Sequence, residues 1–403
     1  MTNGRVRLRG AIHEQFDRLR LSGPGTALRK ARRYVDYTRD VLPHLRAFRE
    51  SDDRKPLARV ARELRLVQAF WGCAPFHYFL YRLYENHFDL SDEDLCAWIP
   101  DWYWYHVFIQ RVNDMAYVAL EGDKNVTDVV LHAAGVPVVV PLWKVARGAV
   151  TDRGFQPMPR GEFERVVAGL RCDRVFGKPV AGAGGEGFAI FRRRPDGSYR
   201  TDDDRLLCWD EVHRLADQTD WVFQEGLPQH ESARRIHAAS INTLRPVTER
   251  LPGGEVRVVA VTLRMGVGGG DTDNAHVGGI SCGVDLDTWR CLKWAQTDGT
   301  LGAIRRTDRH PDSGVVFEGY KLPFRDEVLD ALRRGASALY PMPIMSWDVA
   351  LTPRGPVVLE ANAGLGLSHL QSASHRGLRR EFRIGPERAA EGIPLPPGLA
   401  GRS

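Results

Sequence analysis

The sequence predicts an α+β protein with a helical N-terminal region. From Ala27 to Tyr84 the apolar residues recur at helical spacing. Between Arg174 and Arg192 a strand, a glycine-rich loop and a second strand follow one another, which is the pattern of a hairpin. Ser346–Leu351 and Pro356–Glu360 are two further apolar strands, joined by a short turn that contains Pro353 and Gly355.

Length and composition exclude several classes of protein. The chain has 403 residues, of which 43% are hydrophobic and 27% charged, so it is long enough for two or three globular domains and is neither disordered nor fibrous. No apolar stretch approaches the ~20 residues that span a bilayer. The N-terminus lacks the apolar core of a secretory signal. We therefore expect a cytoplasmic protein without a transmembrane segment.

The six cysteines are far apart and form no C-x-x-C pair, so a zinc site or a disulfide scaffold is not expected. The basic excess lies at the front: residues 1–65 hold 17 Lys or Arg residues and 8 Asp or Glu residues. Such a region could approach nucleic acid, an anionic membrane or an acidic partner, or it could be a solvated helical surface. The aromatic residues nearby form dense apolar clusters, which favours core packing, and we expect no nucleic-acid partner.

The remaining elements follow in order. The helical region should end near Trp98, before Pro100. Further helices are predicted over Asp123–Ala134, Trp209–Gln218 and Arg325–Leu339, and further strands over Val138–Val140, Trp221–Gln224 and Val256–Leu263. The tail after His375 carries no pattern to which chemistry can be assigned.

A glycine loop at residues 181–187 is the first chemical signal. Its glycines, Gly182, Gly184, Gly185 and Gly187, include a formal G-x-G-x-x-G. A dinucleotide-binding fingerprint needs a helix after the loop, whereas Phe188–Phe191 has strand character. What remains is a hairpin whose backbone N–H groups can close over phosphates, preceded by Lys178. The alternative is a plain hairpin with a surface lysine.

Asp348, Glu360 and Asn362 are the second signal. The two strands that carry them are adjacent and antiparallel, so Asp348 and Glu360 can face the same side. Three oxygen ligands would then converge, as Mg²⁺ requires. The alternative is an ordinary acid at a strand end with a turn asparagine.

A third group of residues lies between these two. Gln224, Glu225, Gly226 and Leu227 leave a buried strand, whose edge can pair with an adenine ring, and Glu231 could reach ribose hydroxyls.

Polar residues further along the chain complete the set. Arg245 and Arg264 suit a transferring phosphoryl group and a substrate carboxylate, or are surface ion pairs. Asn274 and His276, in a glycine-rich loop, are candidate substrate contacts, although an incidental loop histidine is an equal reading.

Taken in order, these motifs resemble the ATP-grasp superfamily, and more narrowly its sugar-transfer-associated family, related to proteins of teichuronopeptide biosynthesis. The resemblance covers about Ala74 to Gln371. It is carried by Phe176–Pro179 with the glycine loop, Ile241–Arg245, Gly278–Ile280, Trp347–Ala350 and Val358–Asn362.

The resemblance implies the ATP-grasp fold, in which two α+β lobes clasp ATP. We expect an N-terminal basic helical region over 1–100. A linker and the small lobe would cover 101–228, the large lobe with the metal site 229–375, and a C-terminal tail 376–403.

The resemblance also implies site roles. Lys124 and Lys178 would contact ATP phosphates, Gln224 to Leu227 would hold the adenine, and the acidic set would carry magnesium. The chain departs from the family pattern twice. Ser346 stands where many ATP-grasp ligases have an arginine, so Arg245 or Arg264 would take over its work. Ser232 stands where the ribose-binding acid is usual, which leaves Glu231 one residue away.

Three functions are open at this level. The first is an ATP- and Mg²⁺-dependent ligase that joins a carboxylate to an amine through an acyl phosphate, on a polysaccharide precursor or a peptide-like metabolite. The second is a kinase of the same fold that acts on a hydroxyl. The third is a non-catalytic nucleotide-binding partner of a glycosyltransferase, docked through the basic helices.

Overall fold

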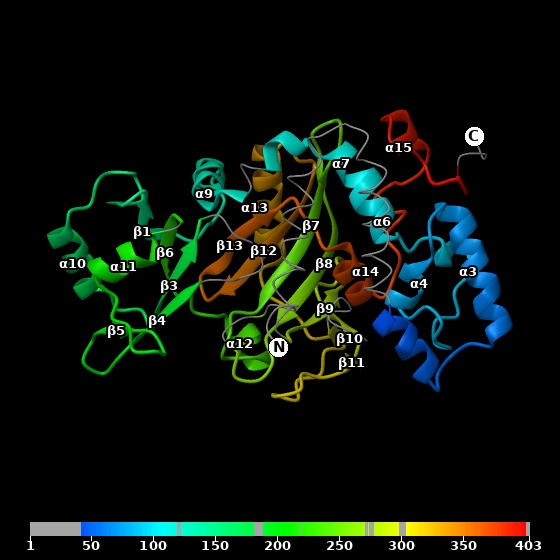
Figure 1. The fold of residues 1–403 in the computed structure, drawn as a ribbon, viewed down its shortest axis with the longest axis horizontal. Coiled ribbons are helices and arrows are strands. Elements are labelled where there is room, and N and C mark those ends of the chain that lie inside the picture. Colours follow the sequence, from blue (N-terminus) through cyan, green and yellow to red (C-terminus); the bar gives the residue numbers. More distant parts are fainter. Residues whose placement is uncertain are drawn as a thin grey trace.

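A computed structural model describes residues 42–118, 122–180, 188–217, 219–270, 273, 278–297 and 304–399. The molecule is elongated: a six-stranded sheet lies at one end, a seven-stranded sheet in the centre and the N-terminal helices at the other end (Figure 1). Every strand pair within the two sheets is antiparallel.

The N-terminal helical region is longer than predicted. After a helix over 42–50 it contains α3 (Leu57–Trp71), α4 (Phe76–Leu80), α5 (Asp92–Leu95), α6 (Asp101–Tyr103), the π-helical turn η2 (Trp104–Phe108), α7 (Ile109–Val112) and the 3₁₀ turn η3 (Met115–Tyr117). Pro100 does not end the region, because it caps the start of α6, where a missing N–H costs nothing. The aromatic clusters are core, as predicted: Trp71, Trp98 and Trp104 are at most 2% exposed.

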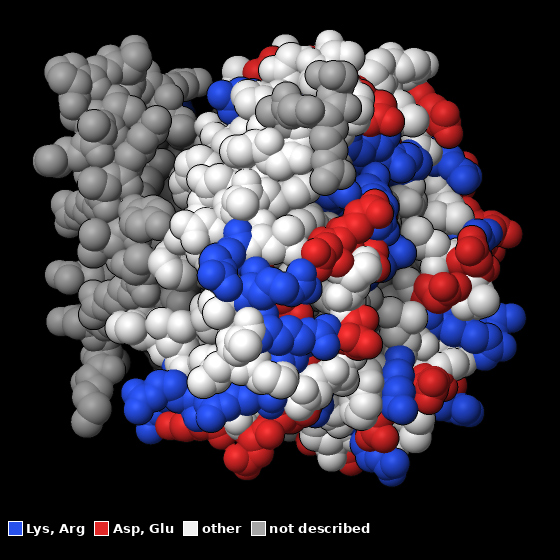
Figure 2. Space-filling model, turned by 90° about the vertical axis from the view of Figure 1, so that its right-hand side faces the viewer, with Lys and Arg blue, Asp and Glu red and all other residues white. Residues whose placement is uncertain are grey.

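The basic residues of this region are largely paired. Arg59 contacts Glu63 and Asp89, and Arg62 contacts Asp92, each at 2.8 Å between nitrogen and oxygen. Figure 2 accordingly shows Lys and Arg side chains interspersed with Asp and Glu on this end of the molecule. Within the described residues, this favours the solvated helical surface over a continuous basic docking face.

The smaller sheet has the order β2-β1-β6-β3-β4-β5. Its strands are β1 (Pro141–Ala146), β2 (Ala149–Thr151), β3 (Arg174–Pro179), β4 (Ala189–Arg193), β5 (Tyr199–Arg200) and β6 (Trp221–Glu225). Two helices, α10 (Arg160–Gly169) and α11 (Trp209–Leu215), cover one face over a core that includes Trp143, Phe163 and Phe223. The predicted β3–β4 hairpin is confirmed.

The larger sheet has the order β11-β10-β9-β8-β7-β12-β13. Its strands are β7 (Thr243–Arg250), β8 (Val256–Met265), β9 (Ile280–Val284), β10 (Cys291–Thr297), β11 (Arg306–Thr307), β12 (Ile344–Thr352) and β13 (Gly355–Asn362). One face packs against α13 (Arg325–Ala338). Part of the other face packs against α14 (Leu367–Ser374) and the N-terminal helices, which leaves the rest of that face for the site.

Three shorter helices complete the fold: α9 (Lys124–Ala133), α12 (Glu231–Ile236) and α15 (Pro386–Ala390). The strand predicted over Val138–Val140 is wrong, since β1 begins only at Pro141. The flanking Pro137 and Pro141 have no N–H to donate, which shortens any ladder through this segment. It makes instead a single parallel bridge, between Val138 and Val358 at the edge of the larger sheet.

None of the helices that the structure describes combines the length and the apolar character needed to cross a membrane. All six cysteines are free thiols, as predicted.

Candidate nucleotide and metal site

A cavity lies where the two sheets meet, and it encloses about 550 Å³ of empty space, the part open to solvent included. Its wall comes from α9, from the smaller sheet and from the edge strand of the larger sheet. Among its lining residues are Lys124, Asp128, Lys178, Val222, Gln224, Leu359 and Glu360.

Lys124 lies in the site because it is the first residue of α9. The helix begins there because the Asp123 carboxylate accepts the backbone N–H groups of Asn125 and Val126, at 2.9 and 3.3 Å. The Lys124 Nζ lies 3.4 Å from Oε1 of Glu360 on β13. The sequence predicted one of these residues as a phosphate contact and the other as a metal ligand, and the structure brings them together.

Lys178 lies on β3 and faces the same cavity. Burial lowers the pKa of its ammonium and the charge of Lys124 lowers that pKa further, whereas Glu360 and Asp348 raise it. Two lysines and two acids therefore share one electrostatic environment at the junction of the sheets. Such a site is suited to a polyanion accompanied by a cation.

Asp348 is held by both of the arginines that the sequence singled out. The Nε and Nη2 of Arg245 donate to its two carboxylate oxygens at 2.7 and 2.6 Å, and Nη1 of Arg264 lies at 3.1 and 3.2 Å. Burial alone raises the pKa of Asp348, but the two guanidinium groups hold that pKa at about 2. Both arginines are therefore ion-paired with Asp348 at partly buried positions, and their roles towards phosphate or substrate stay predictions.

Glu360 and Asn362 share a sheet face with Asp348. The register pairs Asp348 with Glu360 and Ser346 with Asn362 across β12 and β13, and paired residues point to the same side. Two carboxylates and the Oδ1 of an amide are a hard oxygen set. These three side chains fit Mg²⁺.

Asp273 is a site residue that the sequence reasoning missed. It is 9% exposed, accepts the backbone N–H of Thr243 at 3.1 Å and lies 3.7 Å from the Arg264 guanidinium. Burial raises the pKa of its carboxyl, Arg264 lowers that pKa and Asp348 raises it. The sequence feature that could have identified Asp273 is its position next to Asn274 in the polar, glycine-rich loop.

The segment after β6 is only partly at the cavity. Gln224 lines it, and the Gly226 N–H donates to the Arg174 carbonyl at 2.8 Å, which folds the chain back against β3. Glu231 projects from the start of α12, where Arg234 and Arg235 bind its carboxylate at 2.6 and 3.1 Å. It does not line the cavity, so its ribose role stays a prediction.

Six further predicted residues lie outside the described part of the chain: Gly182, Gly184, Gly185, Gly187, Asn274 and His276. Their roles also stay predictions.

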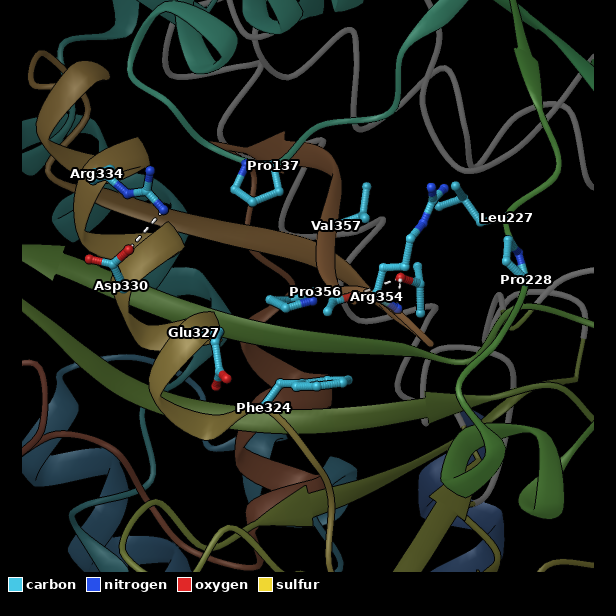
Figure 3. A pocket seen from close by; sticks show the side chains of 12 residues that line it. Pro137, Leu227, Pro228, Phe324, Glu327, Asp330, Arg334, Arg354, Pro356 and Val357 are labelled. Carbon is cyan, nitrogen blue, oxygen red and sulfur yellow. Dashed lines mark hydrogen bonds and ion pairs between the residues drawn. The ribbon is translucent and has the colours of Figure 1, made fainter.

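A second, larger hollow of about 920 Å³ opens beside Leu227 and Pro228 (Figure 3). Its polar rim on α13 is mostly acidic: Glu327 is exposed, and Asp330 is paired with Arg334 at 2.7 Å. No lysine lines it. None of the residues that the sequence analysis predicted as phosphate or metal contacts lines this hollow, whereas Lys124, Lys178 and Glu360 line the smaller cavity.

Two mixed α and β lobes that present lysines and acids to one shared cavity have the architecture of the ATP-grasp class. The chain belongs to the sugar-transfer-associated ATP-grasp family, whose sequence model matches residues 104–384. This confirms the resemblance and the expected fold.

Solved structures of the same class are similar to the chain at low sequence identity. An ADP complex of N5-carboxyaminoimidazole ribonucleotide synthetase is 13% identical, with a TM-score of 0.37 over 69% of this chain and 53% of that one. The VanG D-Ala:D-Ser ligase of Enterococcus faecalis is 14% identical, with a TM-score of 0.39 over 67% and 60%. The biotin carboxylase of Campylobacter jejuni is 12% identical, with a TM-score of 0.40 over 71% and 49%. The chain thus spans about half the length of these proteins. Among curated proteins nothing matches it.

Proposed function

We propose that the protein is an ATP- and Mg²⁺-dependent ligase that joins a carboxylate to an amine through an acyl phosphate. The observation that carries the proposal is the contact of Lys124 with Glu360, because it brings a phosphate-binding cation and a metal-binding acid from opposite walls onto one point. The family description supports an acceptor on a sugar or polysaccharide precursor.

The lysines would act on the phosphates. Lys124 and Lys178 neutralise part of the charge of the triphosphate and orient it along the cavity. When bound at Asp348, Glu360 and Asn362, Mg²⁺ would supply Lewis-acid stabilisation of the phosphoryl oxygens.

The two arginines would act on the acyl group. Arg245 and Arg264 emerge from neighbouring strands, and both donate to Asp348. To bind the acyl group, a guanidinium would exchange a hydrogen bond to Asp348 for one to the substrate carboxylate or to the transferring phosphoryl group. A carboxylate oxygen attacks the γ-phosphorus and ADP leaves. The amine nitrogen then attacks the acyl carbon, phosphate leaves, and the amine loses a proton. Each donor aimed at developing charge contributes about 3 kcal/mol to such a reaction.

The product of ATP cleavage tests the proposal. The protein would be incubated with ATP, Mg²⁺, pooled amino and sugar acids, and hydroxylamine as a substitute amine. We expect ADP together with an acyl hydroxamate, which also identifies the acid. ADP with a phosphorylated acceptor and no hydroxamate would establish the kinase instead, and formation of AMP would contradict an acyl phosphate.

Glu360→Ala is the variant that tests the metal site. We expect a loss of turnover of about 100-fold, because a carboxylate ligand of the proposed Mg²⁺ is removed. The far-UV circular dichroism should not change, since the side chain is about one-third exposed. Glu327→Ala, at the acidic hollow on α13, is the matched control and should keep full activity. Full activity of Glu360→Ala would refute the assignment.

A further inference from the structure

The two arginines that bind Asp348 differ in how firmly they are held. Arg264 on β8 contacts two carboxylates: its Nη1 lies 3.1 Å from Oδ1 of Asp348, and its Nη2 lies 3.7 Å from Oδ1 of Asp273. Arg245 on β7 forms an ion pair with Asp348 alone among the described residues. The side chain of Arg264 is 12% exposed, whereas that of Arg245 is 26% exposed. Arg245 is thus the arginine that is more open to solvent.

Asp273, the second partner of Arg264, is itself fixed in position. Its Oδ2 accepts the backbone N–H and the hydroxyl of Thr243, while its Oδ1 faces Arg264. Thr243 and Arg264 pair across β7 and β8, so the three residues form a closed group on one face of the larger sheet. Burial raises the pKa of the Asp273 carboxyl, and Arg264 is the charge that lowers it most. The buried charge of Asp273 therefore depends on Arg264 for its compensation.

A guanidinium that binds a substrate must give up part of its hydrogen bonding to Asp348, and the cost of this exchange differs between the two arginines. If Arg264 turned away, Asp273 would lose its main cation inside the protein, which is strongly destabilising. If Arg245 turned away, Asp348 would still accept hydrogen bonds from Nη1 of Arg264 at 3.1 and 3.2 Å. Both carboxylates then keep a cation. The exchange is therefore less costly at Arg245.

We propose that Arg245 binds the carboxylate substrate and that Arg264 is a positioning residue held in place by Asp273. Arg264 compensates the charge of Asp348 while Arg245 exchanges a hydrogen bond to Asp348 for one to the substrate. Binding of a carboxylate by Arg245 uses the planar pair of N–H donors, whereas compensation by Arg264 needs only a positive charge at that place. The inference rests on the proposed ligase function and gives separate roles to its two arginines.

Replacing each arginine by lysine separates the two roles, because lysine keeps the charge and lacks the planar pair of donors. The assay is ATP-dependent hydroxamate formation with Mg²⁺ at varied total concentration of the amino and sugar acid pool. Arg245→Lys should raise the apparent KM for the pool at least about tenfold, because a charged hydrogen bond to the substrate is lost. Arg264→Lys should leave the apparent KM nearly unchanged, whereas Arg264→Met should lose turnover because the charge is absent.

Urea unfolding tests whether Asp273 holds Arg264. Arg264→Met leaves the buried Asp273 without its main cation, so the urea midpoint should fall. Adding Asp273→Asn should restore part of that midpoint, because the charge is then removed together with its partner. Arg245→Met should shift the midpoint less than Arg264→Met does. Arg333→Lys, at an exposed arginine on α13, is the matched control and should keep the wild-type apparent KM and midpoint.

The outcomes separate this inference from the function on which it rests. If Arg264→Lys raises the apparent KM as much as Arg245→Lys does, both arginines bind the substrate, and the division of roles is refuted while the ligase stands. A wild-type apparent KM in Arg245→Lys would also refute it, as would a further fall of the urea midpoint when Asp273→Asn is added to Arg264→Met. If the intact protein forms no hydroxamate from the pool, both proposals fail.

Discussion

His77 is a buried imidazole whose two ring nitrogens have no hydrogen-bond partner in the described structure. Burial lowers its pKa to about 3, whereas an unfolded histidine titrates near 6.5. Between these values the unfolded chain binds a proton that the folded chain does not. The stability that neutral His77 provides is therefore present above about pH 6.5 and falls as the pH drops toward 3.

His77→Phe should remove this pH dependence. On going from pH 7.5 to 5.5, the free energy of unfolding of the wild type should fall by about 1.4 kcal/mol more than that of the variant. Urea titrations at the two pH values measure the difference. His132→Gln, at an exposed position, should behave as the wild type. Parallel losses in the wild type and in His77→Phe would show that His77 does not titrate on unfolding.

The sequence predicted the sheet face of a residue correctly where buried and exposed residues alternate along the strand, and it failed where they do not. The alternation along two adjacent strands predicted that Asp348 and Glu360 face one side, and the register confirms this. Lys144 could not be found in the same way. Trp143, Lys144 and Val145 are all buried, so β1 shows no alternation, and the sheet face on which Lys144 lies follows only from the pairing of β1 with β6.

At the scale of elements, α13 contains a glycine that helix propensity alone would replace. A Cβ on Gly335 would lie 2.7 Å from the Trp347 ring on β12, closer than atoms can approach. Gly335→Ala gains about 1 kcal/mol of helix propensity but overpacks the core, which costs about 1–3 kcal/mol. We expect a net loss of stability.

The matched control is Gly161→Ala in α10, where a Cβ would meet nothing within 4 Å. It should leave stability unchanged or raise it by up to about 1 kcal/mol. Urea midpoints of the two variants make the comparison. If Gly335→Ala were stabilising like the control, the close approach of α13 to β12 would be wrong.

The helices α9 and α13 were predicted because 3.6-residue periodicity is a local property. Strands β9 and β10 and the start of β1 were not, because their apolar runs are short and are fixed by pairing with distant strands. The sequence predicted that the helical region ends before Pro100. In the structure Pro100 caps the start of α6, so the region continues.

At the scale of the whole molecule, long-range polar contacts join the N-terminal helical region to the larger sheet and to α14. Arg306, at the start of β11, binds Glu85 of the helical region at 2.7 Å, and Arg82 donates to the Ile304 carbonyl at 2.7 Å. Gln371 of α14 accepts the Ile99 N–H at 2.9 Å and donates to the Tyr81 hydroxyl at 2.8 Å. No sequence pattern reports such contacts, since their partners lie more than 200 residues apart.

The sequence pattern assigned no role to the C-terminal tail. In the structure, ion pairs with one buried acid hold the tail against the larger sheet. Glu249 on β7 is fully buried and binds Arg257 of β8 at 2.9 Å, together with Arg383 and Arg388 of the tail. The negative charge of this carboxylate offsets part of the free-energy cost of removing the guanidinium groups from water. Removing its charge leaves buried Arg388 with Glu391 as its remaining acidic partner, and breaking such a buried ion pair costs about 3 kcal/mol.

Glu249→Gln should therefore lower the free energy of unfolding by about 3 kcal/mol or more and make the tail accessible to trypsin between Arg376 and Arg388. Arg383→Met should cost only about 1 kcal/mol, because Arg383 is partly exposed and also binds Glu391. Urea unfolding and limited proteolysis measure the two effects. Glu318→Gln, an exposed acid on the larger lobe, should change neither. A Glu249→Gln protein as stable as this control, with a protected tail, would mean that the tail is held by its apolar contacts at Phe382 and Ile384 rather than by the buried acid.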